Sequence, residues 1–448
     1  MRDKTLNMTE GSPVRLLIMF SVPMLIGNIF QQLYNIVDSI IVGKLIGADA
    51  LAAIGVTGSV TFLFFALCNG FGSAGGIITS QNFGKQDAAQ VKRCIANTGY
   101  IMIVFPTILG IVAFCGSRLL LTILGTPEKI FSESLRYMQI MCLGLVFVSL
   151  YNYVSSILRA LGDSKTPLYF LIFSCLLNTV LDVVFVKFLG YGVAGAGIAT
   201  LISQFISGAG CMIYAFKYNP YFKLERKDWA VDSILIIKTI KLGVPLSLQF
   251  SLIAISCMAL QKVVNSFGPV AVAAFTAISR VEQVIHQPYQ TLSAALSTFS
   301  GQNYGARKYE RITLGFKKSM LIMVIFTIMM LPIMQFFGSE ITSIFVNEPD
   351  VIAMGAIALK ITSPFYVFLG IIYVVRGALN GVGDAFFALL NGIIEVIGRF
   401  VFPIFFTMIP AIGLWGIWWS VGGVWFISAL TAWLRYEYKK KQLLTSIM

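Results

Sequence analysis

The stretch from residue 23 to residue 38 reads PMLIGNIFQQLYNIVD and decides the class of fold. On a helix its polar side chains fall on one stripe that is roughly 120° wide. That stripe holds Asn28, Gln31, Gln32, Asn35 and Asp38. The opposite side is apolar, and the chain carries almost no charge between residues 16 and 43. The pattern predicts a membrane span whose polar stripe faces a protein interior or a water-filled cavity.

The amides and the carboxylate of this stripe differ in what they indicate. Amides inside a membrane can simply hold neighbouring helices together. A carboxylate at mid-span costs about 2.5–3.5 kcal/mol on insertion scales, which is why intramembrane carboxylates tend to be functional. Asp38 is therefore a stronger functional candidate than the amides beside it.

The composition supports a membrane protein. Of the 448 residues, 57% are hydrophobic and only 12% are charged, with a mean hydropathy of +0.83, whereas globular proteins carry about 25% charged residues. The seven cysteines form no C-x-x-C motif, so neither a metal site nor a disulfide framework is indicated. With a single histidine, a Ser-His-Asp or histidine-ligated metal site has little support.

Segments of about 20 apolar residues are long enough to cross a bilayer. We therefore expect twelve spans, and we expect the first of them to be an uncleaved span rather than a signal peptide. The predicted spans are residues 14–43, 50–79, 94–117, 130–160, 166–189, 192–216, 234–263, 269–299, 312–338, 350–380, 385–408 and 413–436.

The basic residues predict the orientation. If the N-terminus is inside, the connections on that side hold 24 lysines and arginines, against 7 on the other. In this count Arg376 belongs to an inner connection, and Arg280 and Arg399 lie within spans. The positive-inside rule then predicts that both termini are cytoplasmic. The net charge of +13 is explained as an orientation signal, so no nucleic-acid partner is expected.

The chain repeats itself. IMFSVPMLIGN at 18–28 resembles IKLGVPLSLQF at 240–250, and SQNFGKQDAAQVKR at 80–93 resembles GQNYGARKYERITL at 301–314. Two halves of six spans have the same orientation in the membrane. We predict an all-α polytopic fold with two six-helix lobes, 1–225 and 226–448, related by pseudo-twofold symmetry along the membrane normal.

Depth along the predicted spans indicates which polar residues of the first half meet. A helix rises by a constant amount per residue, so depth can be counted from the outer end of each span. On this count the polar groups of spans 1, 5 and 6 lie at similar depth, and they are Asp38, Asn178, Asp182 and Thr200. Two neighbouring carboxylates hold a proton more tightly than either alone. The same oxygens could instead ligate a small hard cation.

The second half carries its charges elsewhere. Glu282 and His286 share a face of the eighth span, with Arg280 nearby, and Glu395 and Arg399 form an i,i+4 pair in the eleventh. We expect these residues to shape a cavity near mid-bilayer. The simpler alternatives are a structural ion pair for Glu395 and Arg399, and a hydrogen-bonded core role for His286.

No string in the chain supports an enzyme. There is no P-loop, so direct use of ATP is not indicated, and no constellation of catalytic residues occurs. The GVAGAG string at 192–197 follows no strand, and close helix packing explains its glycines better than a nucleotide.

Several of these features together resemble the multidrug and toxic compound extrusion (MATE) family, and within it the DinF-like branch. They are the P-x14-D helix, the QNFG and QNYG loops, the RALGD turn at 159–163, and the NTVLDVVFV and GAGIAT segments. By this resemblance Asp38, Asn178, Asp182 and Thr200 form a proton or Na⁺ site in the N-lobe, with no other cofactor.

The resemblance also implies a function. Family members export organic cations and drugs in exchange for protons or sodium, by rocker-switch alternating access. The chain would then act as a monomer in a bacterial or archaeal cytoplasmic membrane. Its cavity candidates are Asn28, Gln31, Tyr34, Asn35, Arg280, Glu282, His286, Glu395 and Arg399.

One alternative comes from the same broad architecture. A flippase for a lipid-linked saccharide needs cations in its cavity to hold a pyrophosphate, and Arg280 and Arg399 could do so. The acidic and aromatic character of the remaining candidates favours cationic cargo by charge attraction and cation–π contact.

Overall fold

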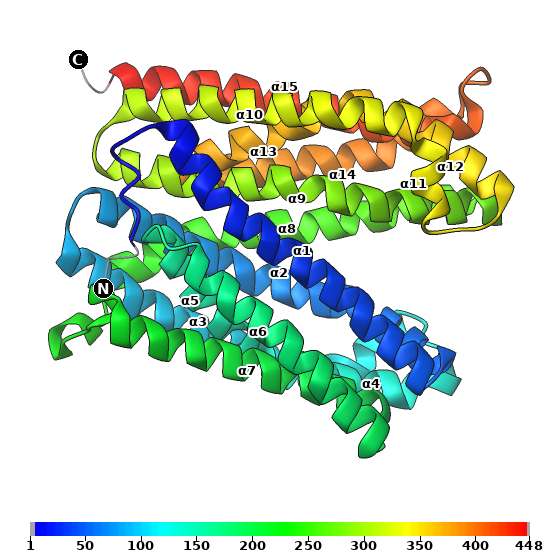
Figure 1. The fold of residues 1–448 in the computed structure, drawn as a ribbon, viewed down its shortest axis with the longest axis horizontal. Helices are drawn as coiled ribbons and strands as arrows, with labels where there is room; N and C mark the ends of the chain where they lie inside the picture. The colour runs from blue at the N-terminus through cyan, green and yellow to red at the C-terminus, as the bar shows by residue number, and fades with distance from the viewer. Residues whose placement is uncertain (1–4, 446–448) are drawn as a thin grey trace. The chain divides into compact units, whose positions relative to one another are not determined.

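The computed structural model describes residues 5–445 and shows helices joined by short connections, with no strand among those residues (Figure 1). Side chains at positions 48, 253–255 and 257–259 lie outside the description, and the cysteine at position 257 is among them. The other six cysteines are free thiols.

The described part of the first half of the chain forms seven α-helices and one short π-helix. In order these are α1 (Pro13–Leu45), α2 (Ala48–Gly84), α3 (Ala88–Ile123), α4 (Glu128–Leu143), α5 (Leu145–Ala160), α6 (Lys165–Asp182), the π-helix η1 (Val183–Phe188) and α7 (Gly192–Tyr218).

The second half begins after two short 3₁₀ turns, η2 (Pro220–Phe222) and η3 (Arg226–Trp229). Its elements are α8 (Ser233–Asn265), α9 (Pro269–Gly305), α10 (Tyr309–Phe336), α11 (Gly338–Ser343), α12 (Pro349–Thr362), η4 (Ser363–Phe365), α13 (Tyr366–Gly381), α14 (Ala385–Thr407), η5 (Gly413–Trp415) and α15 (Gly416–Thr445).

Within the described residues, ten helical segments are long and apolar enough to cross a membrane. An eleventh is added if α4 and α5, which are bent by 43° at their junction, count as one span. The remaining predicted span, 269–299, lies within α9, which is 37 residues long. This helix is long enough to cross a membrane, but its arginine, glutamate and histidine lower its mean hydropathy. The all-α polytopic fold is thus confirmed.

Backbone conformation repeats along the chain at one fixed interval. Positive φ angles occur at Gly47 and Gly268, at Gln86 and Arg307, and at Gly162 and Gly383, and the members of each pair are equally far apart. Helix lengths repeat too: α1 and α8 both have 33 residues, and α2 and α9 both have 37 residues. The repeat predicted from short sequence matches therefore extends to the local conformation of the chain.

By internal contacts the chain forms two compact units. Of the residues that the structure describes, unit 1 comprises 5–7 and 22–248, and unit 2 comprises 8–21 and 249–445. The boundaries fall inside two helices, because α1 begins in unit 2 and continues in unit 1, while α8 begins in unit 1 and continues in unit 2. The division into lobes 1–225 and 226–448 stays a prediction.

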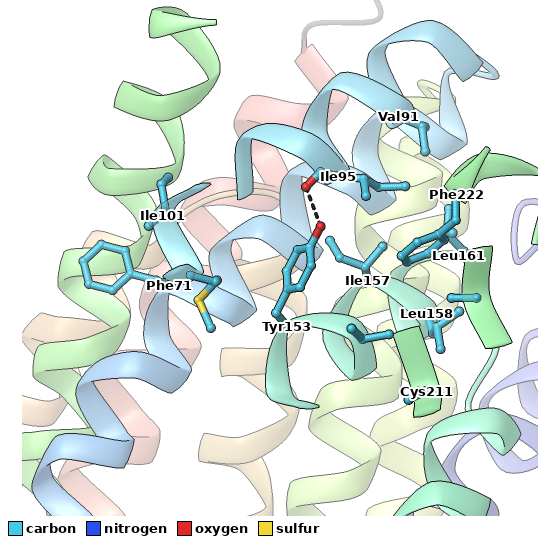
Figure 2. Packing of buried hydrophobic residues seen from close by; sticks show 13 residues of the cluster. Phe71, Val91, Ile95, Ile101, Tyr153, Ile157, Leu158, Leu161, Cys211 and Phe222 are labelled. Carbon is cyan, nitrogen blue, oxygen red and sulfur yellow. Dashed lines mark hydrogen bonds between the residues drawn. The ribbon is translucent and has the colours of Figure 1, made fainter. Parts of the chain in front are cut away.

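Unit 1 has a hydrophobic core built from α2, α3, α5 and α7 (Figure 2). Its members include Val154 and Ile157, which have no exposed surface. At its centre the Tyr153 hydroxyl donates a 2.6 Å hydrogen bond to the Ile95 carbonyl (Figure 2). A buried tyrosine hydroxyl needs such a partner, and this bond ties α5 to α3.

The turn between α5 and α6 explains the RALGD motif. Gly162 adopts a φ of +88°, which a residue with a Cβ rarely adopts. Asp163 then accepts hydrogen bonds from the backbone N–H groups of Lys165 (3.1 Å) and Thr166 (2.9 Å). These bonds satisfy donors that the first turn of α6 would leave free.

Unit 2 is packed with aromatic side chains. Trp418, Tyr366 and Tyr289 are almost completely buried. Phe316 of α10 stacks on Tyr436 of α15 with ring centroids 3.6 Å apart. These large rings fill the space between helices α9, α10, α13 and α15, and they support the polar side chains described below.

Candidate functional site

Two carboxyl groups meet inside unit 1. Asp38 of α1 and Asp182 of α6 are in side-chain hydrogen-bond contact. Asp182 has no exposed surface, and Asp38 is partly buried. A hydrogen bond between two carboxyl groups needs one proton, because two carboxylates have only acceptors. The structure thus brings together the two acids whose depths the sequence matched.

Asn178 connects this pair to the rest of the site. In the amide orientation that satisfies both of its ends, its nitrogen donates to Asp182 Oδ2 (2.7 Å) and to the Tyr34 hydroxyl (3.3 Å). Its oxygen accepts from the backbone N–H of Thr200 at 3.0 Å. The hydroxyls of Tyr34 and Thr200 lie 3.4 Å apart. All four candidates for the ion site therefore belong to one network, together with Tyr34.

The network leaves two carboxyl oxygens unused. Oδ1 of Asp38 and Oδ1 of Asp182 are buried and have no hydrogen-bond partner within the described part of the chain. Buried acceptors without a partner are costly, so they favour a proton or a cation beside them. Two carboxylates, an amide and a hydroxyl are also oxygen ligands of the kind that hard cations prefer.

The helix type changes at Asp182. It is the last residue of α6, and the π-helix η1 follows it directly. A π-helix has a wider turn than an α-helix and often marks a functional site. The local sequence, VVFVKF, contains neither glycine nor proline, so the sequence alone did not predict this change.

Tyr137 of α4 was not among the predicted site residues. This tyrosine is buried and lies close enough to both Asp38 and Asp182 to interact electrostatically with them. A usable signal was present, because Tyr137 lies near the beginning of the fourth predicted span. The depth comparison covered only spans 1, 5 and 6.

A small open pocket adjoins the network within unit 1, and its cavity volume is about 10 Å³. Its lining residues are Gln31, Tyr34, Leu171, Ser174, Cys175, Asn178, Ser203 and Gln204. Of the cavity candidates in the first span, Gln31 and Tyr34 line this pocket. Asn28 is partly buried and Asn35 is exposed, and neither is part of the lining.

A second polar cluster lies in unit 2. Glu282 and His286 are partly buried on α9, and the charge of Arg399 on α14 acts on both. The His286 ring centroid lies 6.2 Å from that of Tyr373 and 6.0 Å from that of Trp425. Arg280, which we expected beside them, is exposed.

The predicted ion pair between Glu395 and Arg399 is wrong. Glu395 pairs with Arg376 instead, with 2.5 Å between Oε1 and Nη2, and both side chains are almost fully buried. An i,i+4 spacing allows a contact but does not require one. Instead, the Glu395 carboxylate reaches the guanidinium of Arg376 on the neighbouring helix α13. Arg376 therefore lies within a helix, not in the inner connection to which we assigned it.

Asn391 completes this buried network. Its side-chain oxygen accepts two hydrogen bonds from Arg376, at 3.0 Å and 2.7 Å. Its nitrogen donates to the Ser428 carbonyl at 2.9 Å. The network ties α13, α14 and α15 together, and both of its charges are partnered. An arginine in the apolar stretch 366–381 was the signal that could have revealed it.

Two related halves of long apolar helices, with a carboxyl pair inside one half, define a multi-pass membrane protein of the transporter class. The MatE family model matches the chain twice, at residues 23–184 and 245–407. The chain therefore belongs to the MATE family of multidrug efflux transporters, whose members are not enzymes. The two matches begin at residues 23 and 245, in step with the internal repeat.

Similar proteins cover the chain almost completely. It is 32% identical to the probable multidrug resistance protein YpnP of Bacillus subtilis, over 97% of both chains. It is 25% identical to the multidrug export protein MepA of Staphylococcus aureus, over 94% of this chain and 93% of that one. The solved structure of a MOP superfamily transporter from Pyrococcus furiosus covers 99% of each chain with a TM-score of 0.91 at 22% identity.

Proposed function

We propose that this protein is a secondary active antiporter that exports organic cations in exchange for protons or sodium. The contact between Asp38 and Asp182 carries the proposal. A buried carboxyl pair can release and rebind one positive charge, which is what exchange of a cationic cargo against an ion requires.

The exchange follows from competition for negative charge. When a proton or Na⁺ occupies the pair, the site carries one negative charge instead of two and attracts an organic cation more weakly. When the ion leaves, the bare carboxylates attract the cation. Because such coupling is reciprocal, a bound cargo weakens the binding of the ion by the same factor. Alternating access by a rocker-switch motion turns this competition into transport.

The side chains that line the pocket next to the pair are of kinds that suit cargo binding. Gln31 and Gln204 offer amide donors and acceptors, and Tyr34 offers an aromatic face. An aromatic face attracts organic cations without requiring a fixed geometry. In unit 2, Glu282 and the rings around His286 provide a second surface of the same kind.

The flippase alternative is weakened by the surroundings of its two arginines. Arg399 lies close to Glu282, and Arg280 is exposed. We further propose that the protein works as a monomer in a bacterial cytoplasmic membrane with both termini inside. The relatives named above that come from bacteria support the location.

The deciding experiment uses vesicles that contain the purified protein. If protons are the coupling ion, adding ethidium on one side of the membrane should change the pH inside the vesicles. If sodium is the coupling ion, the same addition should cause a measurable flux of Na⁺ across the membrane. The Asp38→Asn variant should bind the dye but move neither ion. An ion flux that persists in Asp38→Asn would contradict the assignment of the site.

A competition assay separates exporter from flippase. In nanodiscs, ethidium should be displaced by protons or by Na⁺, and a lipid pyrophosphate should not compete. Tight pyrophosphate binding that is lost in Arg280→Ala, with no dye binding at all, would replace the proposal by the flippase.

A further inference from the structure

The segment before α1 is held firmly on unit 2. The backbone N–H of Met8 donates to the Gln302 side chain at 2.7 Å, and the Met8 carbonyl accepts from the Asn303 side chain at 3.1 Å. Gln302, Asn303 and the Met8 side chain have no exposed surface. Two adjacent amides thus recognise the backbone of a single residue from both sides.

Basic residues of the same unit secure the next positions. Arg311 of α10 donates to the carbonyls of Met8 (3.3 Å) and Gly11 (2.7 Å). Lys308 donates to the carbonyl of Thr9 at 3.0 Å. Hydrogen bonds from charged donors are roughly twice as strong as neutral ones. We call residues 8–11 the leader.

The linker before α8 is held in a similar way, but on unit 1. The Asn97 side chain accepts from the backbone N–H of Asp232 at 2.8 Å and donates to the Ala230 carbonyl at 3.2 Å. The Tyr100 hydroxyl donates to the Trp229 carbonyl at 2.6 Å. Helices α1 and α8 each begin in one unit and continue in the other. In both cases the segment before the helix is held by side chains that hydrogen-bond to its backbone.

This fastening bears on α1 in particular. The helix leaves the leader at Pro13, belongs to unit 2 up to Ser21, and from Val22 belongs to unit 1, where it carries Asp38. Pro23 stands immediately after the change of unit. A proline inside a helix removes one backbone hydrogen bond and makes a bend at that point easier.

We propose that the docked leader is an anchor that coupled transport requires. It fixes the first turns of α1 to unit 2, so that a change in unit 2 acts on the helix that bears Asp38. Without the anchor the beginning of α1 moves freely, and the ion site and unit 2 become uncoupled. The proposal rests on the proposed antiport, but it concerns residues outside the ion site.

Release of the leader is measured first. With Met8→Cys in an otherwise cysteine-free protein, the thiol should react slowly with a thiol reagent while the leader is docked. Arg311→Ala should increase that rate at least tenfold, because it removes the donors to two leader carbonyls. Lys317→Ala is the matched control, since it removes an exposed cation from the same helix without a contact to the leader.

Transport is measured next in variants that keep Met8 or replace it with aspartate. Arg311→Ala should retain ethidium binding and its displacement by protons but lose most gradient-driven export. Lys317→Ala should retain both. A second variant, Met8→Asp, releases the leader from its own side and leaves unit 2 unchanged. Ser12→Asp is its control, because it adds the same charge at an exposed position that tolerates aspartate before a helix.

The outcomes are distinct. If the thiol rate rises in Arg311→Ala and export stays at the wild-type level in both Arg311→Ala and Met8→Asp, the anchor proposal is overturned while the antiport stands. If export falls in Lys317→Ala or Ser12→Asp as well, the loss reflects charge changes rather than the anchor, and the proposal also fails. If the wild-type protein shows no ion-coupled export, the proposed function itself is wrong.

Discussion

The two halves of the chain share one backbone pattern but differ in the side chains at the positions of the proposed ion site. At the interval that separates Gly47 from Gly268, Asn178 and Asp182 of the first half correspond to Arg399 and Pro403 of the second. The first half thus holds an amide and a carboxyl, which the proposed antiport uses to exchange a cation. The second half has a permanent cation at one of these positions and no side-chain oxygen at the other.

The backbone conformation of the two halves also differs at these positions. The π-helix η1 directly follows Asp182, whereas α14 continues through Pro403 to Thr407 as an α-helix. Ser174, which lines the pocket of unit 1, corresponds to Glu395, which is locked in a buried ion pair. The repeat extends to the backbone at the positive-φ turns, while the polar side chains at corresponding positions have different surroundings.

The largest effect that follows from this contrast is on transport. Asp38→Asn should reduce gradient-driven ethidium export to the level of empty vesicles, because the carboxyl pair no longer holds an exchangeable charge. Glu282→Gln, which removes a carboxylate from the polar cluster of unit 2, should weaken ethidium binding but retain uphill export. An equal loss in both variants would show that the halves share the coupling role.

The second effect is on stability, and it tests the partner of Glu395. Arg376→Leu leaves a buried carboxylate unpaired, so the free energy of unfolding should fall by about 3–5 kcal/mol. The double variant Arg376→Leu with Glu395→Leu should recover part of the loss. Thermal unfolding in detergent measures this.

A double-mutant cycle sharpens the same point. Glu395 should show a large interaction energy with Arg376 and a small one with Arg399. The reverse result would restore the ion pair within α14 that the sequence predicted.

The third effect is a pH dependence of cargo binding. Protons compete with a cationic dye for the carboxyl pair, so acidification should weaken ethidium affinity, by about 5- to 150-fold if the coupling is of ordinary size. The dependence should vanish in Asp182→Asn and persist in Glu282→Gln. Titrations in nanodiscs at several pH values check both, and a dependence that follows Glu282 would move the proton site to unit 2.

The smallest expected effect concerns Asp163, which follows the positive-φ glycine Gly162 as Asp384 follows Gly383. Asp163 satisfies backbone donors of α6, whereas Asp384 pairs with Arg435 at 2.9 Å. Asp163→Ala should therefore cost about 1 kcal/mol, and Asp163→Asn much less, because asparagine can also accept these bonds. Thermal unfolding of the two variants checks this. If Asp163→Asn costs as much as Asp163→Ala, the charge and not the capping is what matters.

The sequence by itself determined the fold class, the repeat and the residues of the proposed ion site. Apolar length is a property of consecutive residues, and depth along a span follows from the constant rise of a helix. Both can be counted without knowledge of packing. This is why Asp38, Asn178, Asp182 and Thr200 were found from residues 16–45 and 165–205 alone.

Only the tertiary structure decided which charges are partners. Glu395 stands one helical turn from Arg399, yet its carboxylate binds Arg376 on another helix. Tyr137 reaches the carboxyl pair from α4, and Gln302 and Asn303 hold a segment at the other end of the chain. Such contacts depend on how helices rotate and pack against one another. The order of residues along one helix does not contain that information, because many side chains share a depth and only packing selects those that meet.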